Sequence, residues 1–300
     1  MKEASVLVVN KRTFKQFLRE SYHFAGIFHD FRLRLAASRG KEPILIFQLG
    51  KVGSTSIMAS LKALKLGRPI YHVHFLTEDG IAHSTSIYGE MPRSFRSRGK
   101  HLLMSQILRK HLAKGLTEPK WKIITPIREP IGRNISSFFQ IIDVLIPDFE
   151  ERYRAGSIKM AELTDLFLEQ YPVSRFLNWF DVEMKPVFGV DVFSSAFPTA
   201  KGYKIYEGPQ ADVLLLRLEN INECANEAFK EFLNVEQFKL VKANVASEKK
   251  YYEAYQQFAA SVILPETYLN QVYASKYARH FYSAEEIDAF KAKWNKNGGR

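Results

Sequence analysis

A glycine-containing turn follows a short apolar run, and its residue types suit the binding of a phosphate-like anion. The segment FQLGKVGSTSIMASL spans residues 47–61, and Gly50 and Gly53 let the backbone turn tightly and approach a ligand. Lys51 adds a full positive charge. At the start of the helix that we expect next, amides and hydroxyls face one point, where the helix dipole adds positive potential. The residues that carry these hydroxyls are Ser54, Thr55 and Ser56.

The position of the lysine separates this turn from the P-loop of enzymes that hydrolyse ATP or GTP. In G-x-x-x-x-G-K-[ST] the lysine stands directly before Ser or Thr, whereas Lys51 precedes Gly53 here. The sequence also has no clear apolar run that ends in an aspartate suited to Mg²⁺. A P-loop kinase-like phosphoryl transferase is therefore our second hypothesis, and magnesium-dependent turnover of ATP would favour it.

A second candidate anion site follows another apolar run, in the segment IREPIGRNISSFF at residues 127–139. We expect Arg128 at the carboxyl end of a strand, in the same plane as the glycine turn. On the helix that follows, Arg133 and Ser136 stand three residues apart and share a face. We predict that the guanidinium of Arg128 and the hydroxyl of Ser136 hold a second phosphate. Two such sites at adjacent strand ends suit a nucleotide with phosphate at both ends.

Together the two motifs resemble those of sulfotransferases that use 3′-phosphoadenosine 5′-phosphosulfate. KVGSTS at residues 51–56 is similar to their 5′-phosphosulfate loop, and R-x-P-x-x-R-x-x-S-x-F at residues 128–138 is similar to their 3′-phosphate motif. The resemblance extends to bacterial sulfotransferase-like proteins of capsular polysaccharide synthesis and covers most of residues 43–294. Three further segments carry it, at 178–193, 213–221 and 273–294.

The resemblance implies a role for the residues of both motifs. Lys51 would contact the bridging oxygen of the leaving phosphate and stabilise its growing negative charge. Arg128 and Ser136 would bind the 3′-phosphate, and no metal ion would be needed. The 5′-phosphosulfate would be held by Gly53, Ser54, Thr55 and Ser56. The implied reaction is an in-line displacement that moves the sulfuryl group to a hydroxyl of a carbohydrate, either a polysaccharide or a glycolipid.

Two histidines in IYHVHFL are the leading candidates for the general base. His72 and His74 stand two residues apart, so they share one face of a strand, and imidazole has an ordinary pKa near neutrality. We rank His74 first because it is nearer the strand end, where ligands bind in such sheets. Glu78 and Asp79 are acidic alternatives, and His83 is a weaker one. Hydrogen-bonded core histidines remain an alternative; a metal-binding H-x-H pair is less favoured, because no third ligand is evident, and we predict no metal site.

Apolar runs and helical periodicity predict the elements that position these residues. The expected strands are 44–47, 70–76, 121–127 and 213–218, and helical patterns occur at 11–38, between the strands, and at 250–295. This alternation predicts an α/β fold with a central parallel sheet flanked by helices, and the resemblance implies its P-loop NTPase-like sulfotransferase form. We expect an N-terminal helical extension at 1–42 and a single domain at 43–300. Residues 171–212 show few regular signals and are interpreted as an insertion with substrate contacts.

Three other groups of residues have a structural and a functional interpretation. Arg217 and Glu219 are interpreted as a structural ion pair at the end of the fourth strand. Aromatic residues beside carboxylates suggest either a sugar platform or a structural cluster, at Trp179, Phe180, Asp181 and Glu183. Aromatic residues at helical spacing near the C-terminus are interpreted as core, at Tyr273, Tyr277, Phe281 and Tyr282.

The charge of the chain indicates an anionic partner. The 300 residues include 43 Lys and Arg against 32 Asp and Glu, a net charge of +11. Residues 93–122 hold nine basic residues and one acidic residue, and we interpret this run as a candidate site for an anionic acceptor, through Arg93, Arg96 and Arg98. A non-catalytic protein that binds nucleic acid or an acidic polymer is the third hypothesis. No nucleic-acid-binding motif is present, so we expect no nucleic-acid partner.

The remaining composition narrows the class of protein. The single cysteine, Cys224, excludes an intramolecular disulfide framework and a cysteine-based zinc or iron–sulfur site. No run approaches the ~18 to 20 apolar residues of a transmembrane helix, and the run from Val6 to Val9 is too short for the core of a signal peptide. We therefore expect a cytoplasmic protein, with peripheral membrane contact left open.

Overall fold

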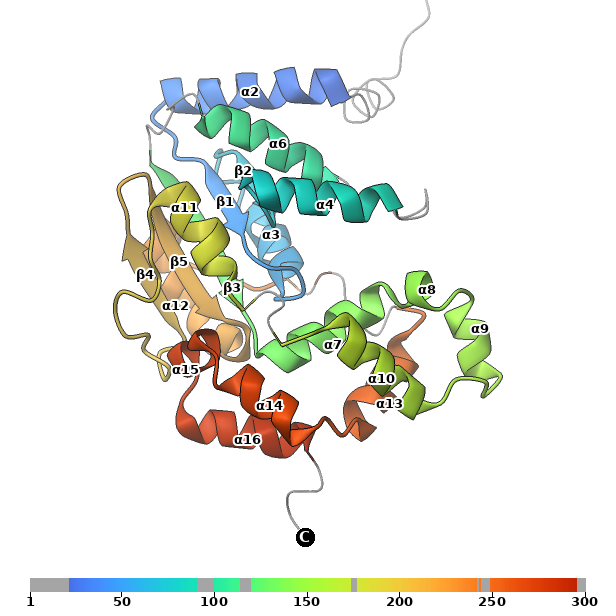
Figure 1. Ribbon diagram of the computed structural model, residues 1–300. Helices are drawn as coiled ribbons and strands as arrows, with labels where there is room; N and C mark the ends of the chain where they lie inside the picture. Colours follow the sequence, from blue (N-terminus) through green and yellow to red (C-terminus); the bar gives the residue numbers. More distant parts are fainter. Residues whose placement is uncertain are drawn as a thin grey trace, which may run out of the picture.

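Five strands form one sheet, in the order β2-β1-β3-β5-β4 (Figure 1). The computed structural model describes residues 22–90, 100–113, 120–173, 177–241, 243 and 249–295. The strands are β1 Ile44–Phe47, β2 Ile70–Val73, β3 Trp121–Ile127, β4 Tyr203–Glu207 and β5 Ala211–Arg217. All neighbouring pairs are parallel except β4 and β5, which are antiparallel. The prediction of an α/β fold with a central, mainly parallel sheet is confirmed.

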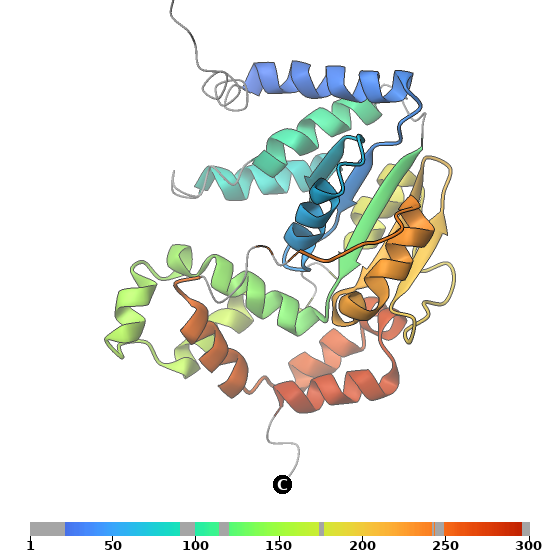
Figure 2. The same cartoon turned by 180° about the vertical axis from the view of Figure 1, so that it is seen from behind.

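Successive residues of the central strands pack on opposite faces of the sheet. Leu45 and Phe47 of β1 belong to the core cluster on one face, whereas Ile44 and Ile46 belong to the cluster on the other. Because both faces are covered, these strands are continuously apolar in sequence. Figures 1 and 2 show the covering helices: α3 (Ser54–Ala63) and α12 (Ile221–Leu233) on one face, and α6 (Lys100–Leu112) and α11 (Lys185–Phe188) on the other.

A third buried cluster lies beyond the carboxyl ends of the parallel strands and is built from helices (Figure 1). Its residues include Ile131, Phe138 and Phe258, which are fully buried. The helices that contribute are α7 Pro130–Gln140, α8 Ile142–Leu145, α9 Phe149–Arg154, α10 Met160–Gln170, α13 Tyr252–Ser261, α14 Glu266–Tyr273, α15 Lys276–Phe281 and α16 Ala284–Trp294. The predicted helical C-terminal part is therefore confirmed, and it forms the layer opposite the sheet's carboxyl edge.

The N-terminal helix α2 (Tyr22–Ser38) lies along α6, and α4 (Glu78–Glu90) lies on the same side of the molecule (Figure 1). Leu33 of α2 is 2% exposed and belongs to the same core cluster as residues of the sheet. The helical pattern at 11–38 is confirmed from residue 22 onward, and its first residues lie outside the described part. Among the described helices, none combines the length and apolarity needed to cross a bilayer.

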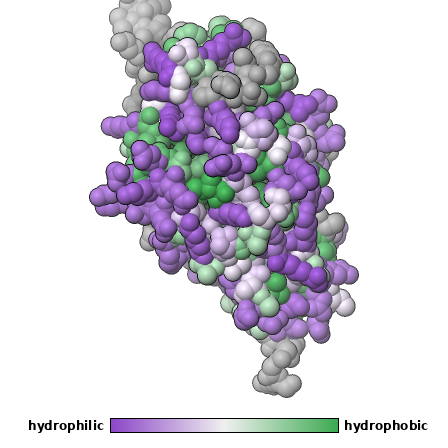
Figure 3. All heavy atoms as spheres, turned by 90° about the vertical axis from the view of Figure 1, so that its left-hand side faces the viewer, coloured by the Kyte–Doolittle hydropathy of each residue, from purple (hydrophilic) through white to green (hydrophobic). Residues whose placement is uncertain are grey.

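Two strand predictions were wrong in detail. The edge strand β4 lies inside the segment 171–212, where no strand was predicted, because its sequence YKIYE mixes charged and apolar residues instead of forming an apolar run. Its charged residues Lys204 and Glu207 oppose the addition of a further strand. Figure 3 shows this side of the molecule, whose surface is mainly hydrophilic. The mixed sequence of this partly exposed edge strand therefore explains why the strand was missed.

Strand β2 is shorter than predicted, ending at Val73 instead of Leu76. The backbone amides of Leu76 and Thr77 donate to the carboxylate of Glu183, at 2.7 and 3.0 Å. Glu183 is 1% exposed and belongs to a one-turn π-helix, Phe180–Met184. These two amides therefore bond to the carboxylate of Glu183, which is distant in sequence, and not to a neighbouring strand.

Candidate active site

A cleft of about 380 Å³ lies where the parallel strands end. Strand β1 lies between β2 and β3, so the loops that follow these three strands meet at one edge of the sheet. The predicted residues of the two motifs and the histidine pair line this cleft: Lys51, Gly53, Ser54, Thr55, Ser56, His72, His74, Arg128 and Ser136. Residues that are 85 positions apart in the chain, from Lys51 to Ser136, thus border one space.

The glycine turn has a backbone conformation that directs it toward the start of α3. Lys51 has a φ of 73° and Gly53 a φ of 80°, both in the left-handed region. A Cβ atom at Gly53 would lie 2.6 Å from Cδ1 of Leu218, so the turn also packs closely against the residue that follows β5. Helix α3 begins at the next residue, Ser54, and a helix N-terminus presents backbone N–H groups and positive potential to an anion. The local sequence therefore places a lysine and a helix N-terminus at this turn, the arrangement that the anion-site prediction requires.

Ser56 has a structural contact in addition to its place in the cleft. Its hydroxyl lies 3.3 Å from both the backbone oxygen and the backbone nitrogen of Ala243, donating to the first and accepting from the second. Ser60, one turn later, accepts a hydrogen bond from the backbone amide of Val241 at 2.7 Å. These contacts attach the segment after α12 to helix α3, beside the cleft.

The motif after β3 contributes one cation and one hydroxyl to the cleft. Nη1 of Arg128 donates to the backbone oxygen of Lys51 at 3.3 Å, which joins the two motifs directly. Ser136 lies two turns into α7 and lines the same cleft. Arg133, which was expected on the face of Ser136, is 7% exposed and donates to the Gly50 oxygen at 3.1 Å. Arg133 therefore supports the glycine turn from behind and does not line the cleft.

Helix α7 begins with a buried carboxylate that fixes the position of Arg128. Glu129 is 5% exposed and accepts from the amides of Ile131 and Gly132, at 2.7 and 2.6 Å. The hydroxyl of Tyr273 donates to the same carboxylate at 2.5 Å. Burial raises the pKa of Glu129, and these hydrogen bonds oppose that effect. Three donors on one carboxylate satisfy the first amides of the helix and hold the loop before it.

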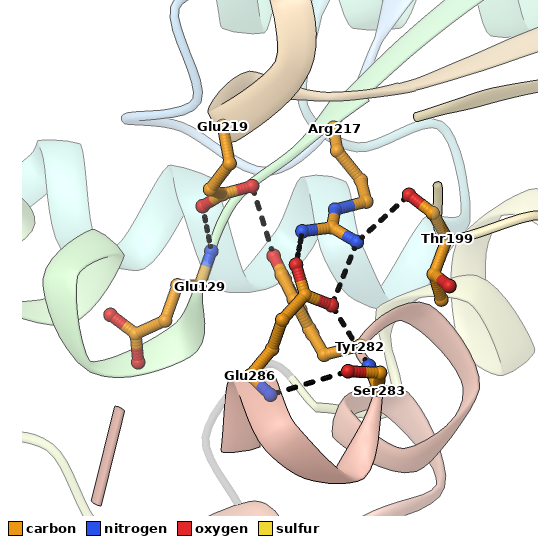
Figure 4. A network of polar contacts seen from close by, with 7 residues as sticks. All are labelled: Glu129, Thr199, Arg217, Glu219, Tyr282, Ser283 and Glu286. Carbon is orange, nitrogen blue, oxygen red and sulfur yellow. Dashed lines mark hydrogen bonds and ion pairs between the residues drawn. The ribbon is translucent and has the colours of Figure 1, made fainter. Parts of the chain in front are cut away.

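A polar network ties this loop to β5 and to the C-terminal helices (Figure 4). Arg217 pairs with the carboxylate of Glu286 through both Nη1 and Nη2 of its guanidinium. Glu219 accepts from the amide of Glu129 at 2.7 Å and from the hydroxyl of Tyr282 at 3.3 Å. The predicted Arg217–Glu219 ion pair was therefore wrong in its partner: Arg217 is structural, but its partner comes from α16.

His72 and His74 meet a third histidine, His101, at the start of α6. The ring centroids lie 5.3 Å apart for His72 and His74, 4.7 Å for His72 and His101, and 4.9 Å for His74 and His101. Burial, followed by the neighbouring histidines, holds the pKa of His72 well below its ordinary value. Burial, with His101 as the next cause, lowers the pKa of His74 to about 4. These shifts favour neutral rings near pH 7, and a neutral imidazole has one nitrogen with a lone pair.

The other candidates for a base do not line the cleft. Glu78 pairs with Arg109 at 2.5 Å on the surface, and neither Asp79 nor His83 borders the cleft. A helical pattern between the second and third strands was predicted, and α6 (Lys100–Leu112) lies there, but nothing in the sequence pattern indicated that His101 would meet the histidine pair.

The suggested sugar platform at residues 179–183 is part of the core. Trp179 and Phe180 are 3% and 4% exposed. The indole nitrogen of Trp179 donates to the backbone oxygen of His74 at 2.9 Å, and Asp181 pairs with Lys276 at 3.0 Å. The structural interpretation is therefore the right one, as it is for the C-terminal aromatic residues, which are buried: Tyr273, Tyr277, Phe281 and Tyr282.

Several lining residues were missed because they come from distant parts of the chain. They are Gln140, Leu218, Ala243, Lys249, Tyr251 and Tyr255. Tyr251 and Tyr255 are four residues apart, a spacing that indicates one helical face, and that was the available signal. The basic residues Arg93, Arg96 and Arg98 lie outside the described residues.

The comparisons with known proteins concern the second half of the chain. A family model described as "Putative capsular polysaccharide synthesis protein" matches residues 157–283. No curated protein and no solved structure matches the chain significantly. The matched region includes β4, β5 and the segment with Lys249 and Tyr255, which borders the cleft. It ends before the C-terminus and begins after both anion motifs, so it relates the chain to a capsular-polysaccharide-related group through its second half.

Proposed function

We propose that this protein is a sulfotransferase that moves a sulfuryl group from 3′-phosphoadenosine 5′-phosphosulfate to a hydroxyl of a carbohydrate, either a polysaccharide or a glycolipid. One observation carries the proposal: two phosphate-type motifs and the histidine pair of β2 line the same cleft. The family match supports a carbohydrate-related acceptor. The parallel sheet, with its glycine turn between β1 and α3, supports a fold of the P-loop sulfotransferase type.

The donor would lie with one phosphate group at each motif. The 5′-phosphosulfate would meet the N-terminus of α3 and the ammonium group of Lys51, and the 3′-phosphate would meet Arg128 and Ser136. Nη1 of Arg128 lies 3.3 Å from the backbone oxygen of Lys51. A hydrogen bond therefore joins the loops that carry the two positive side chains, Lys51 and Arg128. A nucleotide with phosphate at both ends would satisfy both sites at once.

The transfer itself would be an in-line displacement at sulfur. The acceptor oxygen forms a bond to sulfur while the bond from sulfur to the bridging oxygen breaks, and adenosine 3′,5′-bisphosphate leaves. Lys51 stabilises the charge that develops on this bridging oxygen. His74 takes the proton of the acceptor hydroxyl at Nε2, which lies 3.9 Å from the position of a Cβ atom built on Gly50. The negative charge of a bound donor would raise the pKa of His74 toward a value suited to this step.

Calorimetric titration with adenosine 3′,5′-bisphosphate tests the donor site. We expect one molecule to bind per chain; no heat of binding at high micromolar nucleotide would show that the proposal is wrong. Transfer of labelled sulfate from the donor to a panel of glycans and glycolipids tests the reaction. Magnesium-dependent turnover of ATP without sulfuryl transfer would instead support the phosphoryl transferase.

The substitution Lys51→Ala tests the role of the lysine in the transition state. Turnover should fall by about 100-fold or more, with little change in the melting temperature. Lys65→Ala is a matched control, because Lys65 is also a lysine with positive φ, 50°, and does not line the cleft. Equal turnover in the two variants would contradict the role assigned to Lys51.

A further inference from the structure

Three histidines from two separate elements form the one group in the described part of the chain with the geometry of a metal site. His72 and His74 come from β2 and the residue after it, and His101 comes from the first turn of α6. One ring nitrogen of each lies within 4.8 Å of those of the other two. All three rings line the cleft. The sequence disfavoured a metal site because the H-x-H pair had no evident third ligand, and the fold supplies that ligand.

Backbone carbonyl groups fix the orientation of two of the rings. Nδ1 of His74 lies 2.8 Å from the backbone oxygen of Gln48, and Nδ1 of His101 lies 2.9 Å from the backbone oxygen of His72. A carbonyl oxygen only accepts, so each Nδ1 carries the hydrogen and each Nε2 carries a lone pair. Metal-binding histidines are typically held in this way, with the second ring nitrogen donating to a carbonyl or carboxylate.

The side chain of Gln48 contacts the third ring. Gln48 is fully buried, its amide lies 2.8 Å from Nε2 of His72, and its Oε1 has no hydrogen-bond partner. If the amide turns by 180°, Oε1 accepts from Nε2 of His72 and Nδ1 of that ring carries the lone pair. The turn gives Oε1 a donor, moves the amide nitrogen to the position that has no partner, and makes Nδ1 of His72 available as a ligand.

We propose that His72, His74 and His101 bind one divalent cation of the zinc class. Three imidazole nitrogens are a ligand set that suits zinc, cobalt and nickel, and three protein ligands leave a fourth position open, as in catalytic zinc sites. In tetrahedral geometry the ligand nitrogens would lie about 3.3 Å apart, so the rings must rotate slightly toward one another. The ion would lie near the glycine turn, because Cε1 and Nε2 of His74 both lie 3.9 Å from the position of a Cβ atom built on Gly50.

Binding of this ion does not depend on the proposed transfer reaction, but the consequence for catalysis does. The ion would use the lone pair that we assigned to the general base, Nε2 of His74. A hydroxyl at the open position would then lose its proton to solvent water more readily, because a zinc ion lowers the pKa of a bound hydroxyl or water. The cluster therefore has two states, a metal-free base and a metal-loaded activator of the acceptor.

The test uses the full chain after removal of metal with a chelator. Titration with Co²⁺ should give one ion per chain and the visible absorption bands of four-coordinate cobalt, and Zn²⁺ should displace it. In His101→Ala, affinity should fall by at least ten-fold and the bands should disappear. In His83→Ala, which replaces an exposed histidine outside the cleft, the cobalt affinity and the absorption bands should be unchanged.

Two results would overturn the metal site. One is the absence of cobalt bands in the wild-type protein, and the other is equal cobalt affinity in His101→Ala and wild type. Binding of adenosine 3′,5′-bisphosphate to each variant shows whether the donor cleft is folded, and His101→Gln serves if His101→Ala is unstable. The nucleotide titration also separates the two proposals, since loss of the metal site leaves the Lys51 and Arg128 contacts in place.

Discussion

The left-handed residues of the glycine turn show how single positions build the candidate site. Lys51 is one of four non-glycine residues with positive φ in the described chain, a conformation that is costly for an ordinary side chain. Gly53 also has a positive φ, but glycine adopts this conformation without a steric cost. Lys51 therefore holds a strained conformation at the position where a positive charge is proposed to act. The strain is consistent with a backbone shaped for a ligand.

Gly53→Ala should reduce both stability and nucleotide affinity. The left-handed backbone costs an alanine about 1 to 2 kcal/mol, and the new Cβ atom would lie 2.6 Å from Leu218, which adds a steric cost. Gly156→Ala is the matched control: Gly156 has a φ of 69° with nothing within 4 Å of the added atom. Urea unfolding and calorimetry with adenosine 3′,5′-bisphosphate measure the two effects. Affinity should fall at least ten-fold in Gly53→Ala alone, and equal affinity in both variants would contradict a ligand at this turn.

The residues of the site that the sequence predicted are those whose chemistry is local. Lys51 to Ser56 act through one turn and the helix it begins, so their types and order contain the information. His101 and Gln48 act through contacts with residues 24 to 29 positions away. No spacing rule covers such pairs, because a loop and a helix of arbitrary length separate them.

At the scale of elements, the N-terminus of α7 is held by a side chain from α14. The buried carboxylate of Glu129 receives two backbone amides of α7 and the hydroxyl of Tyr273. Through this contact the C-terminal helices fix the loop that carries Arg128. The hydroxyl of Tyr277, on α15, adds a second attachment by donating to the backbone oxygen of Arg128 at 2.9 Å.

Tyr273→Phe should destabilise the protein by about 1.5 to 3 kcal/mol, the range for a hydrogen bond to a charged group. Tyr268→Phe, the control, removes a buried hydroxyl that donates to a neutral backbone oxygen, that of Tyr171, at 2.9 Å, and should cost about 0.5 to 1.5 kcal/mol. Chemical denaturation of both variants measures the difference. A larger loss in Tyr268→Phe than in Tyr273→Phe would show that Glu129 does not depend on this donor.

The elements that could be predicted are those with a strong apolar pattern. The three inner strands β1, β3 and β5 are buried on both faces, and their apolar runs identified them; β2, at the edge, is buried at every second residue. The edge strand β4 and the π-helix at Phe180–Met184 have no such pattern. Both lie in the segment 171–212, where contacts with other elements decide the conformation. Pairing with β5 stabilises β4, and the contacts of Glu183 with the backbone after β2 stabilise the π-helix.

At the scale of the whole molecule, the cleft lies between the sheet and the C-terminal helical layer. The segments that follow β1 and β3 supply the two motifs, β2 with the residue after it and α6 supply the histidines, and the segment around Lys249 and Tyr255 supplies the other side. The pairing of Arg217 with Glu286 and the contacts of Glu219 join the two layers beside this cleft (Figure 4). Sequence patterns predicted each layer, but not how the two layers meet, because that depends on contacts across 60 or more residues.

The Arg217–Glu286 pair predicts how the stability of the whole molecule changes with pH. Burial alone would raise the pKa of Glu286, but the hydrogen bonds from Arg217 and from the amide of Ser283 outweigh it and lower the pKa below its ordinary value. The folded state therefore favours the carboxylate. Its contribution is fully present above the unfolded pKa of about 4.3 and is lost as the pH falls through the folded value.

Glu286→Gln should therefore be less stable than the wild type at pH 7, by about 1 to 3 kcal/mol, because Arg217 is 2% exposed and loses its charged partner. The difference should shrink between pH 5 and pH 3, where the wild-type carboxylate becomes protonated and its own stability falls. Urea unfolding at pH 7, 5, 4 and 3 measures this convergence. Glu285→Gln is the control, since Glu285 is the exposed neighbour on α16 and does not pair with Arg217, and its unfolding curve should stay close to that of the wild type. A gap between Glu286→Gln and wild type that is the same at pH 3 and pH 7 would mean that packing, and not the charge of Glu286, joins α16 to the sheet.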